Sequence, residues 1–372
     1  MINKNLWISM PALMVAMALS SCGKIYRQAT YSVLQDSKYD AVYLNESIED
    51  FRAFGFEFGD SCDVSFSNGL TFEDIPFFNG YYVRTGQPLI VGYPGYDYVA
   101  VTRNNKGLWT ESGLTNDDTA TITLREAGKY KAQQEAMSQS YSNDRKDYKS
   151  DAQFANFRAL SGGNLKANFL YRGATPIDNR KNRASTVDGF LGENEINFVL
   201  NLADTEEEFR GYREATDFAS PYVANLYDEG NIALLSMSSA YSTDLYKQKL
   251  ASGLNKMIES DGPIYIHCLE GKDRTGFVCL VLEALAGASY DEMLADYMKT
   301  YENYYGISKE GTPEKFKAVE SVYFLDFTSY LHGTEDTKAL SEADYRQDAM
   351  DYLLSAGMSA ENIAALTLMI TE

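Results

Sequence analysis

The stretch that decides the fold is His267-Cys268-Leu269-Glu270-Gly271-Lys272-Asp273-Arg274-Thr275-Gly276. An apolar run at residues 263–266 precedes it, and residues 275–288, which follow, are apolar on nearly every side of a helix. The first run is typical of a buried strand and the second of a helix packed against a sheet. The sequence therefore predicts a strand, a short loop and a helix, with a thiol where the loop begins.

A loop of this kind is suited to binding an oxyanion. Its backbone N–H groups can converge on one point, and the dipole of the following helix adds positive potential there. Cys268 lies where these groups favour the nucleophilic thiolate. Arg274 offers a planar fork for two phosphate oxygens, a geometry that lysine does not copy. Thr275 can donate a hydrogen bond to the sulfur as it leaves.

The other residues of the stretch have expected supporting roles. We expect His267 to orient the loop rather than act as a base, and Lys272 to widen the positive field and hold a second phosphate. The substrate-binding positions expected in the loop are Leu269, Glu270, Gly271, Lys272 and Gly276.

The chemistry also needs a general acid that protonates the leaving oxygen and later activates water. Asp273, inside the loop, is the first candidate. Asp204, just after an apolar run at residues 196–202, and Asp244, 24 residues before the cysteine, are the alternatives.

The stretch fits the C-x5-R-[ST] signature and resembles the HCxxGKDRTG loop of the bacterial atypical branch of the cysteine-based tyrosine and dual-specificity phosphatases. The resemblance extends over roughly residues 150–372. It includes Asn156-Phe157-Arg158, Leu170-Tyr171-Arg172 and Tyr352-Leu353-Leu354. Arg158 and Arg172 could steer phosphate, and an ion pair at the edge of the core is an equally good interpretation of them. It implies an α/β fold, a sheet flanked by helices, and hydrolysis of phosphate monoesters through a phosphocysteine without a cofactor or metal.

Two departures from this family bear on the general acid. The Asp-Leu-Arg that ends a strand in the family stands here as Asn201-Leu202-Ala203. The mobile-loop aspartate of the larger tyrosine phosphatases has no clear counterpart around residues 236–241. Both departures favour Asp273 in the loop.

Three functions remain open from the sequence. The leading one is a phosphatase for phosphotyrosine or mixed phosphoprotein substrates. The second is a phosphoinositide or inositol phosphate phosphatase, because Lys272 resembles the lysine in the loops of lipid phosphatases. The third, an inactive phosphate-binding or adhesion module, is disfavoured by the presence of Cys268, Asp273, Arg274 and Thr275 together.

Composition excludes several other classes. The 372 residues carry a formal charge of −20, which disfavours nucleic-acid partners. The sequence contains two histidines, which disfavours a zinc site and a Ser–His hydrolase. Cys62 and Cys279 are expected to be buried thiols, since the few cysteines are no disulfide framework.

The N-terminus predicts export and a lipid anchor. Residues 1–21 have a lysine near the start and a short apolar segment, as in a signal peptide. Leu19-Ser20-Ser21-Cys22 resembles the lipobox of bacterial lipoproteins, which implies acylation of Cys22. We therefore expect a lipid-anchored protein of the bacterial cell envelope, with residues 22–40 as a tether.

The rest of the chain predicts two domains. Alternating apolar residues and glycine turns over residues 41–130 indicate a small all-β domain. Its aromatic stretch Phe77-Phe78-Asn79-Gly80-Tyr81-Tyr82 could face a ligand, but a hairpin with Asn79-Gly80 at its turn explains the stretch at least as well. Residues 131–155 are charged and are expected to form a linker, partly helical. Residues 156–372 are expected to form the phosphatase domain, with late helices that start near Tyr290, Thr312, Ser341 and Ser359.

Overall fold

A computed structural model describes residues 27–36 and 38–372. The described residues form two compact units, the first ending at Gln139 and the second comprising Ser140–Glu372. The predicted signal peptide and Cys22 lie outside the described residues. Within those residues, none of the helices is both long and apolar enough to cross a membrane.

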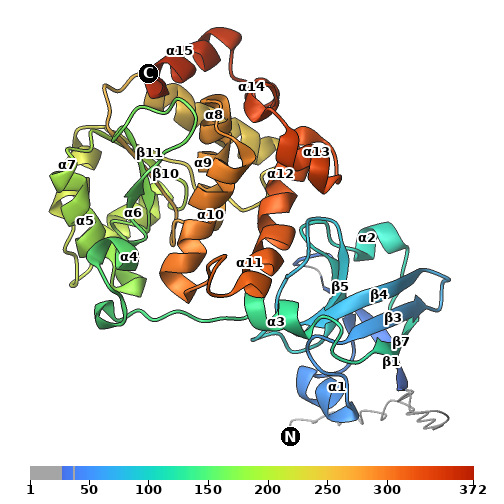
Figure 1. Ribbon diagram of the computed structural model, residues 1–372. Coiled ribbons are helices and arrows are strands. Elements are labelled where there is room, and N and C mark those ends of the chain that lie inside the picture. The colour runs from blue at the N-terminus through green and yellow to red at the C-terminus, as the bar shows by residue number, and fades with distance from the viewer. Residues whose placement is uncertain (1–26, 37) are drawn as a thin grey trace, which may run out of the picture. The chain divides into compact units, whose positions relative to one another are not determined.

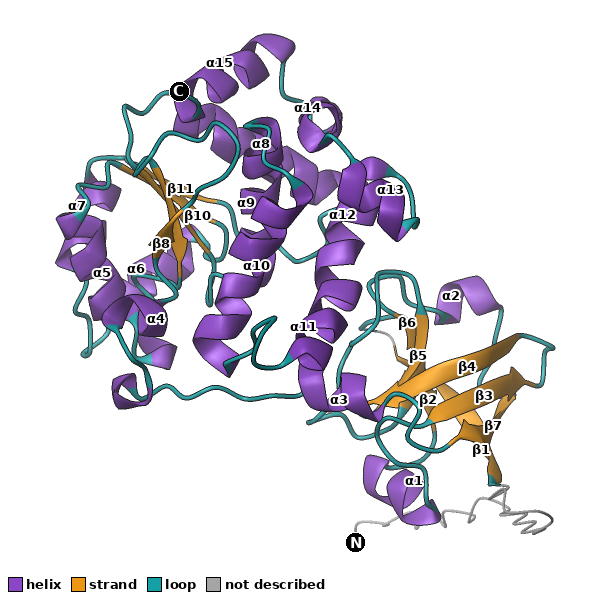
Figure 2. Cartoon of the chain, viewed as in Figure 1, coloured by secondary structure: helices purple, strands orange, loops and turns teal. Residues whose placement is uncertain are grey.

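The first unit is a closed β-barrel, coloured orange in Figure 2. Around the barrel the strand order is β1-β2-β6-β5-β4-β3-β7, and every neighbouring pair is antiparallel except β4 with β5. Three short helices, α1 (Ile48–Phe54), α2 (Trp109–Ser112) and α3 (Lys131–Met137), complete the unit. The strands are β1 (Gln28–Asp36), β2 (Ala41–Leu44), β3 (Ser61–Phe66), β4 (Thr71–Phe78), β5 (Pro88–Val91), β6 (Ala100–Arg103) and β7 (Thr119–Glu126).

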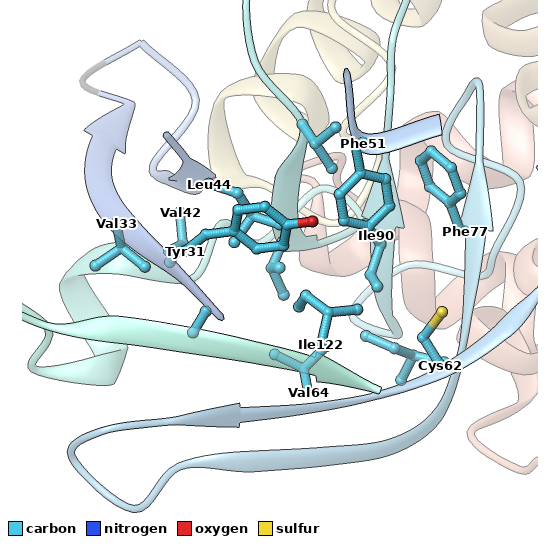
Figure 3. Close-up of a cluster of buried hydrophobic side chains, with 14 of the residues drawn as sticks. Tyr31, Val33, Val42, Leu44, Phe51, Cys62, Val64, Phe77, Ile90 and Ile122 are labelled. Atoms are coloured by element: carbon cyan, nitrogen blue, oxygen red, sulfur yellow. The ribbon is translucent and has the colours of Figure 1, made fainter. Parts of the chain in front are cut away.

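The core of the barrel consists of the side chains at alternate positions along its strands, which point inward. In β1, for example, Ala29, Tyr31 and Val33 are buried while their neighbours are exposed or half-buried. Figure 3 shows Tyr31, Phe51 and other apolar side chains of this core converging. Cys62 lies among them as a buried free thiol, as expected.

Two sequence predictions for this unit are wrong. The tether predicted over residues 22–40 contains β1, because its alternation provides an inward apolar face. The hairpin predicted at Asn79-Gly80 does not form, since β4 ends at Phe78 and pairs in parallel with β5. Asn79 instead exchanges hydrogen bonds with Gln134 of α3, at 3.2 and 2.7 Å.

The second unit is built on a five-stranded sheet in the order β11-β10-β12-β9-β8. The first four strands are parallel, and β8 is antiparallel to β9. Nearly every residue of these four parallel strands is buried, as expected for a sheet covered on both faces. The strands are β8 (Arg158–Ala159), β9 (Leu170–Gly173), β10 (Phe198–Asn201), β11 (Ile232–Leu234) and β12 (Ile264–His267).

Helices cover this sheet on both sides (Figure 1). Side chains such as Val187, Phe209 and Val223 of α5, α6 and α7 pack on Val199 and Tyr265 of the sheet. Helices α8 and α9 contact the strands on the other side. The helices are α4 (Asp151–Ala155), α5 (Ala184–Glu193), α6 (Glu206–Glu214), α7 (Pro221–Asp228), α8 (Asp244–Ile258), α9 (Asp273–Leu285), α10 (Tyr290–Tyr305), α11 (Pro313–Val319), α12 (Leu325–His332), α13 (Thr337–Glu342), α14 (Tyr345–Ser355) and α15 (Ala360–Ile370), with the short turns η1 (Arg145–Asp147), η2 (Asn179–Lys181) and η3 (Glu320–Phe324).

The predicted fold class, an α/β sheet flanked by helices and preceded by a small all-β unit, is confirmed. One predicted helix start is wrong. Ser341 lies inside α13, and the following helix is capped by Asp344, whose carboxylate accepts from the Arg346 N–H at 3.1 Å. A carboxylate satisfies the first-turn N–H groups there as well as the predicted serine would have done.

Candidate active site

The cysteine loop joins the central strand of the sheet to a buried helix. Strand β12 ends at His267 and α9 begins at Asp273. The loop turns sharply at Gly271, whose φ of +68° suits glycine. A Cβ at this position would lie 2.2 Å from the carbonyl oxygen of Gly173, so a side chain there would displace the loop from β9.

The carbonyl groups of the loop are bonded from outside it. Three successive carbonyls accept hydrogen bonds from β9, from the segment directly after β9 and from α10, which fixes the orientation of the intervening peptide planes. The pairs are Leu269 O with Thr175 N at 3.2 Å, Glu270 O with Tyr304 Oη at 2.9 Å, and Gly271 O with Arg172 Nη2 at 2.8 Å.

The N–H groups of the same loop are left free. Within the described chain, the backbone N–H groups of residues 268–272 donate to no protein acceptor. Since the carbonyls are bonded on the outside, these donors remain for an anion, and the start of α9 adds its dipole. The loop is therefore suited to binding an oxyanion.

Asn156, the residue that caps α4, supports the loop from beneath. Its Nδ2 donates to Glu270 O at 3.2 Å and to Thr300 Oγ1 at 3.1 Å. Its Oδ1 accepts from Arg158 at 2.8 Å and from Asn303 at 3.0 Å. The backbone of Asn156 is left-handed, with φ +51°, and the side chain is fully buried.

Replacing Asn156 by glycine should destabilise the second unit by about 2 kcal/mol, because it leaves several buried polar groups without their partner. Glycine tolerates the left-handed backbone, so the loss of stability measures the contribution of the Asn156 side-chain amide. Asn182→Gly is the matched control, since Asn182 has φ +57° on the exposed end of η2. Denaturant unfolding measures both variants. Equal stability of the two would contradict this role for Asn156.

Two arginines near the loop pair with one buried carboxylate. Asp296 of α10 forms ion pairs with Arg158, at 2.6 Å, and with Arg172. Burial alone raises the pKa of Asp296, but the two guanidinium groups outweigh it and hold this pKa below its ordinary value. The sequence left open whether these arginines steer phosphate or form a core-edge ion pair. The structure places both in the ion pair.

The predicted nucleophile and phosphate ligand lie together at this end of the sheet. Cys268 is buried, with 3% of its surface exposed. The Nη1 of Arg274 donates to Met237 O at 3.0 Å and to Leu202 O at 3.5 Å. These carbonyls come from the end of β10 and from the connection after β11, so the topology of the sheet positions the guanidinium.

The positions after Arg274 are both buried. The hydroxyl of Thr275 makes no hydrogen bond within the described chain, so its predicted bond to the sulfur is not formed here and its role stays a prediction. Gly276 faces the ring of Tyr297, which would lie 2.8 Å from a Cβ. Glycine therefore lets α9 approach α10 closely, and its role toward substrate also stays a prediction.

The three candidate acids differ in their surroundings. Asp273 begins α9, and its side chain is half exposed. Asp204 is buried and accepts from Asn201 Nδ2 at 2.8 Å; burial raises its pKa, against the opposing charge of Arg274. Asp244 is exposed at the first turn of α8.

Lys272 bridges the acids of the loop. Its Nζ lies 3.6 Å from the Glu270 carboxylate and 3.8 Å from that of Asp273. Burial lowers the pKa of Lys272, but Asp273, Tyr305 and Glu270 together outweigh it and raise this pKa well above its usual value. The ammonium group is therefore charged, and it adds positive potential beside the half-exposed Asp273.

Sequence reasoning missed Tyr141, which lay in the predicted linker. Its hydroxyl donates to the carboxylate of Glu270, and its ring stacks on Tyr304 at 4.7 Å. The guanidinium of Arg183 lies 5.1 Å from the centre of the same ring. No periodic signal surrounds Tyr141, so only the fold reveals that it holds the loop.

His267 is fully buried beneath the loop. Its Nδ1 lies 3.1 Å from the carbonyl oxygen of Cys268, and its Nε2 has no partner within the described chain. Burial lowers the pKa of His267 to about 4; the hydrogen bond with the Cys268 carbonyl opposes this shift, and the charge of Arg274 contributes to it. A neutral ring that donates from Nδ1 suits the predicted orienting role.

This pKa predicts a specific pH dependence of stability. Between about pH 6.5 and pH 4 the unfolded chain binds a proton at His267 that the folded chain does not. The free energy of unfolding should therefore fall by about 3 kcal/mol as pH falls through that window. In His267→Asn, whose Nδ2 can still reach the Cys268 carbonyl, the fall should be smaller by this amount. If the free energy of unfolding fell equally with pH in the two proteins, the low pKa would not belong to His267.

Comparison with known proteins gives two matches. Residues 152–372 match the model of a group described as the tyrosine phosphatase family. A stretch of 84 residues is 33% identical to the triple specificity protein phosphatase PtpB of Mycobacterium tuberculosis. That stretch covers 20% of this chain and 30% of the length of PtpB.

Proposed function

Because the chain belongs to the tyrosine phosphatase family, we propose that its second unit hydrolyses phosphate monoesters through a phosphocysteine intermediate on Cys268. The observation that carries this proposal is the cysteine loop itself. Its carbonyls are bonded outward, and its N–H groups donate to no acceptor among the described residues. The thiol of Cys268 is buried at the start of the loop, and Arg274 follows in the first turn of α9. Such a loop is suited to stabilising an oxyanion with donors that are already in place before the reaction.

In the first half-reaction the Cys268 thiolate attacks phosphorus, and the bond from phosphorus to the leaving oxygen breaks. Asp273 gives its proton to that oxygen. Arg274 and the loop N–H groups hold the three non-bridging oxygens as charge builds on them.

In the second half-reaction water attacks the phosphocysteine. Asp273 takes a proton from the water, the sulfur–phosphorus bond breaks, and the thiolate is restored. Thr275 donates a hydrogen bond to the departing sulfur. The products are inorganic phosphate and the free enzyme, so no co-reactant besides water is consumed.

We propose phosphotyrosine or mixed phosphoprotein substrates, in line with the description of the matching family. The test is parallel turnover of phosphotyrosine peptides, phosphoserine peptides, phosphoinositides and soluble inositol phosphates by the whole protein. We expect the phosphotyrosine peptides to give the highest kcat/KM. Turnover of inositol compounds alone would overturn this substrate class while leaving the reaction type intact.

Asp273→Asn tests the proton transfer. Because the variant cannot protonate the leaving oxygen, kcat should fall by about 10²- to 10⁴-fold with an alkyl phosphate and much less with an aryl phosphate whose phenol is acidic. Asp204→Asn is the comparison, since Asp204 is the buried alternative. A leaving-group dependence that appears in Asp204→Asn and not in Asp273→Asn would reverse the assignment.

We also propose that the protein is anchored in the bacterial envelope by acylation of Cys22. The support is the sequence of residues 1–22 alone, which resembles a lipoprotein signal. Metabolic labelling with a clickable fatty acid in a bacterial host should label the wild type and leave Cys22→Ser unlabelled. Equal labelling of both proteins would exclude this anchor.

A further inference from the structure

The first unit carries a pocket that the phosphatase reaction does not use. Its volume is about 660 Å³, within the range of roughly 300–1,000 Å³ found for small-ligand sites. It is lined by residues 38–40 and 102–107 together with Tyr81, Tyr93 and Tyr96, all of them in the barrel unit. The pocket therefore belongs to the β-barrel by itself.

Tyrosine rings form a bent wall of this pocket. Tyr39 and Tyr96 are nearly parallel, with centroids 6.1 Å apart, whereas Tyr93 is tilted by 44° to Tyr96 and Tyr81 by 42° to Tyr93. Tyr39 and Tyr93 are 49% and 42% exposed. The nearly parallel rings of Tyr39 and Tyr96 stack on each other, and the other neighbouring rings are tilted, so these rings do not form a slot of two facing parallel rings for a planar base. A puckered sugar ring can lay its polarised C–H groups on successive electron-rich faces.

The pocket is cationic although the chain is strongly acidic. Lys38, Arg103 and Lys106 line it together with the carboxylate of Asp40, and a second carboxylate, that of Asp36, lies close enough to raise the pKa of Lys38 and of Tyr81. The Asp40 carboxylate already accepts hydrogen bonds from the N–H and hydroxyl of Thr110, at 3.0 and 2.6 Å. The Nε of Arg103 is buried and has no acceptor within the described chain. The excess of cations favours a ligand with a carboxylate or similar anion.

Side-chain amides supply the remaining polar groups. Asn104 is fixed by its Nδ2, which donates to the carbonyl of Val83 at 2.6 Å, and its Oδ1 is left to accept. Asn105 lies beside it on the same lining segment. Carboxamides can donate to one hydroxyl of a diol and accept from the next. We propose that this pocket binds a short acidic carbohydrate of the uronic-acid class, and that the barrel is a carbohydrate-binding module.

The test is calorimetric titration of the whole protein with an oligogalacturonate of four units. Maltotetraose, which is uncharged, and adenosine monophosphate, which is planar and anionic, are titrated in parallel. We expect saturable binding of the oligogalacturonate and at least a tenfold weaker response to the other two. Absence of saturable uronate binding would overturn the proposal, as would equal affinity for the neutral sugar or tighter binding of the nucleotide.

Two surface variants locate the binding. Tyr93→Ala removes an exposed ring, and Lys106→Gln removes a cation at the pocket; each should raise the Kd by about tenfold. Lys131→Gln is the control, because Lys131 is an exposed lysine of the same unit outside the pocket. Uronate affinity that is unchanged in both pocket variants would overturn the site. Phosphatase activity should be the same in all three variants.

Discussion

Cys268→Ser is expected to reduce phosphatase activity on the order of 10⁵-fold, to the background rate, as removal of the nucleophile does in other covalent catalysts. Serine in place of the buried thiol presents a hydroxyl that stays protonated and is a far weaker nucleophile than a thiolate. The measurement is kcat/KM for a generic aryl phosphate, with wild type and variant prepared in parallel.

The variant should keep its fold and its phosphate site. The loop carbonyls are bonded by Thr175, Tyr304 and Arg172, none of which the substitution touches. Inorganic phosphate or vanadate should therefore still bind Cys268→Ser, with the unfolding midpoint unchanged. Cys279→Ser is the matched control, because Cys279 is fully buried and burial raises its pKa to about 12, which keeps that thiol neutral. Loss of activity in the control would contradict the assignment.

Arg274→Lys is expected to lower kcat/KM by about 10²- to 10³-fold, the effect of removing a donor to a developing oxyanion. The guanidinium is oriented by the carbonyls of Met237 and Leu202, which leaves the rest of its fork for two phosphate oxygens. Lysine keeps the charge but offers a single point of contact. The loss should therefore appear mainly in kcat, since the charge still attracts the dianion.

A substitution of Lys272 in the same loop distinguishes the effect of side-chain geometry from that of positive charge. Lys272→Arg keeps a cation in the loop and should change kcat/KM by less than about tenfold, because Lys272 is engaged by Glu270 and Asp273. A larger loss in Lys272→Arg than in Arg274→Lys would contradict the placement of the phosphate on Arg274.

The sequence predicted the loop and its flanking elements because their signals are local. The apolar run before His267 and the nearly all-apolar segment after Asp273 predict a strand and a helix buried in an α/β unit, and these are β12 and α9. An ion pair at the edge of the core was one of two interpretations that the sequence allowed for Arg158 and Arg172. Its partner, Asp296, lies 138 residues from Arg158, and no local pattern joins them.

Other features were missed because tertiary contacts decided them. Strand β1 shows the period of two, but its inward residues include Ala29 and Tyr31, which are less apolar than a typical strand core. Asn-Gly favours a tight turn, but Asn79 accepts a hydrogen bond from the side-chain amide of Gln134 instead. Tyr141 acts on a loop residue 129 positions away.

The most direct test of the central claim is detection of the phosphocysteine. Asp273→Asn, which is expected to slow its hydrolysis, is mixed with an aryl phosphate bearing an acidic phenol and quenched in acid within milliseconds. Peptide mass analysis should then find one phosphoryl group on Cys268, and none on the same peptide of Cys268→Ser. Turnover without any phosphoryl group on Cys268, or with phosphate on another residue, would contradict the account.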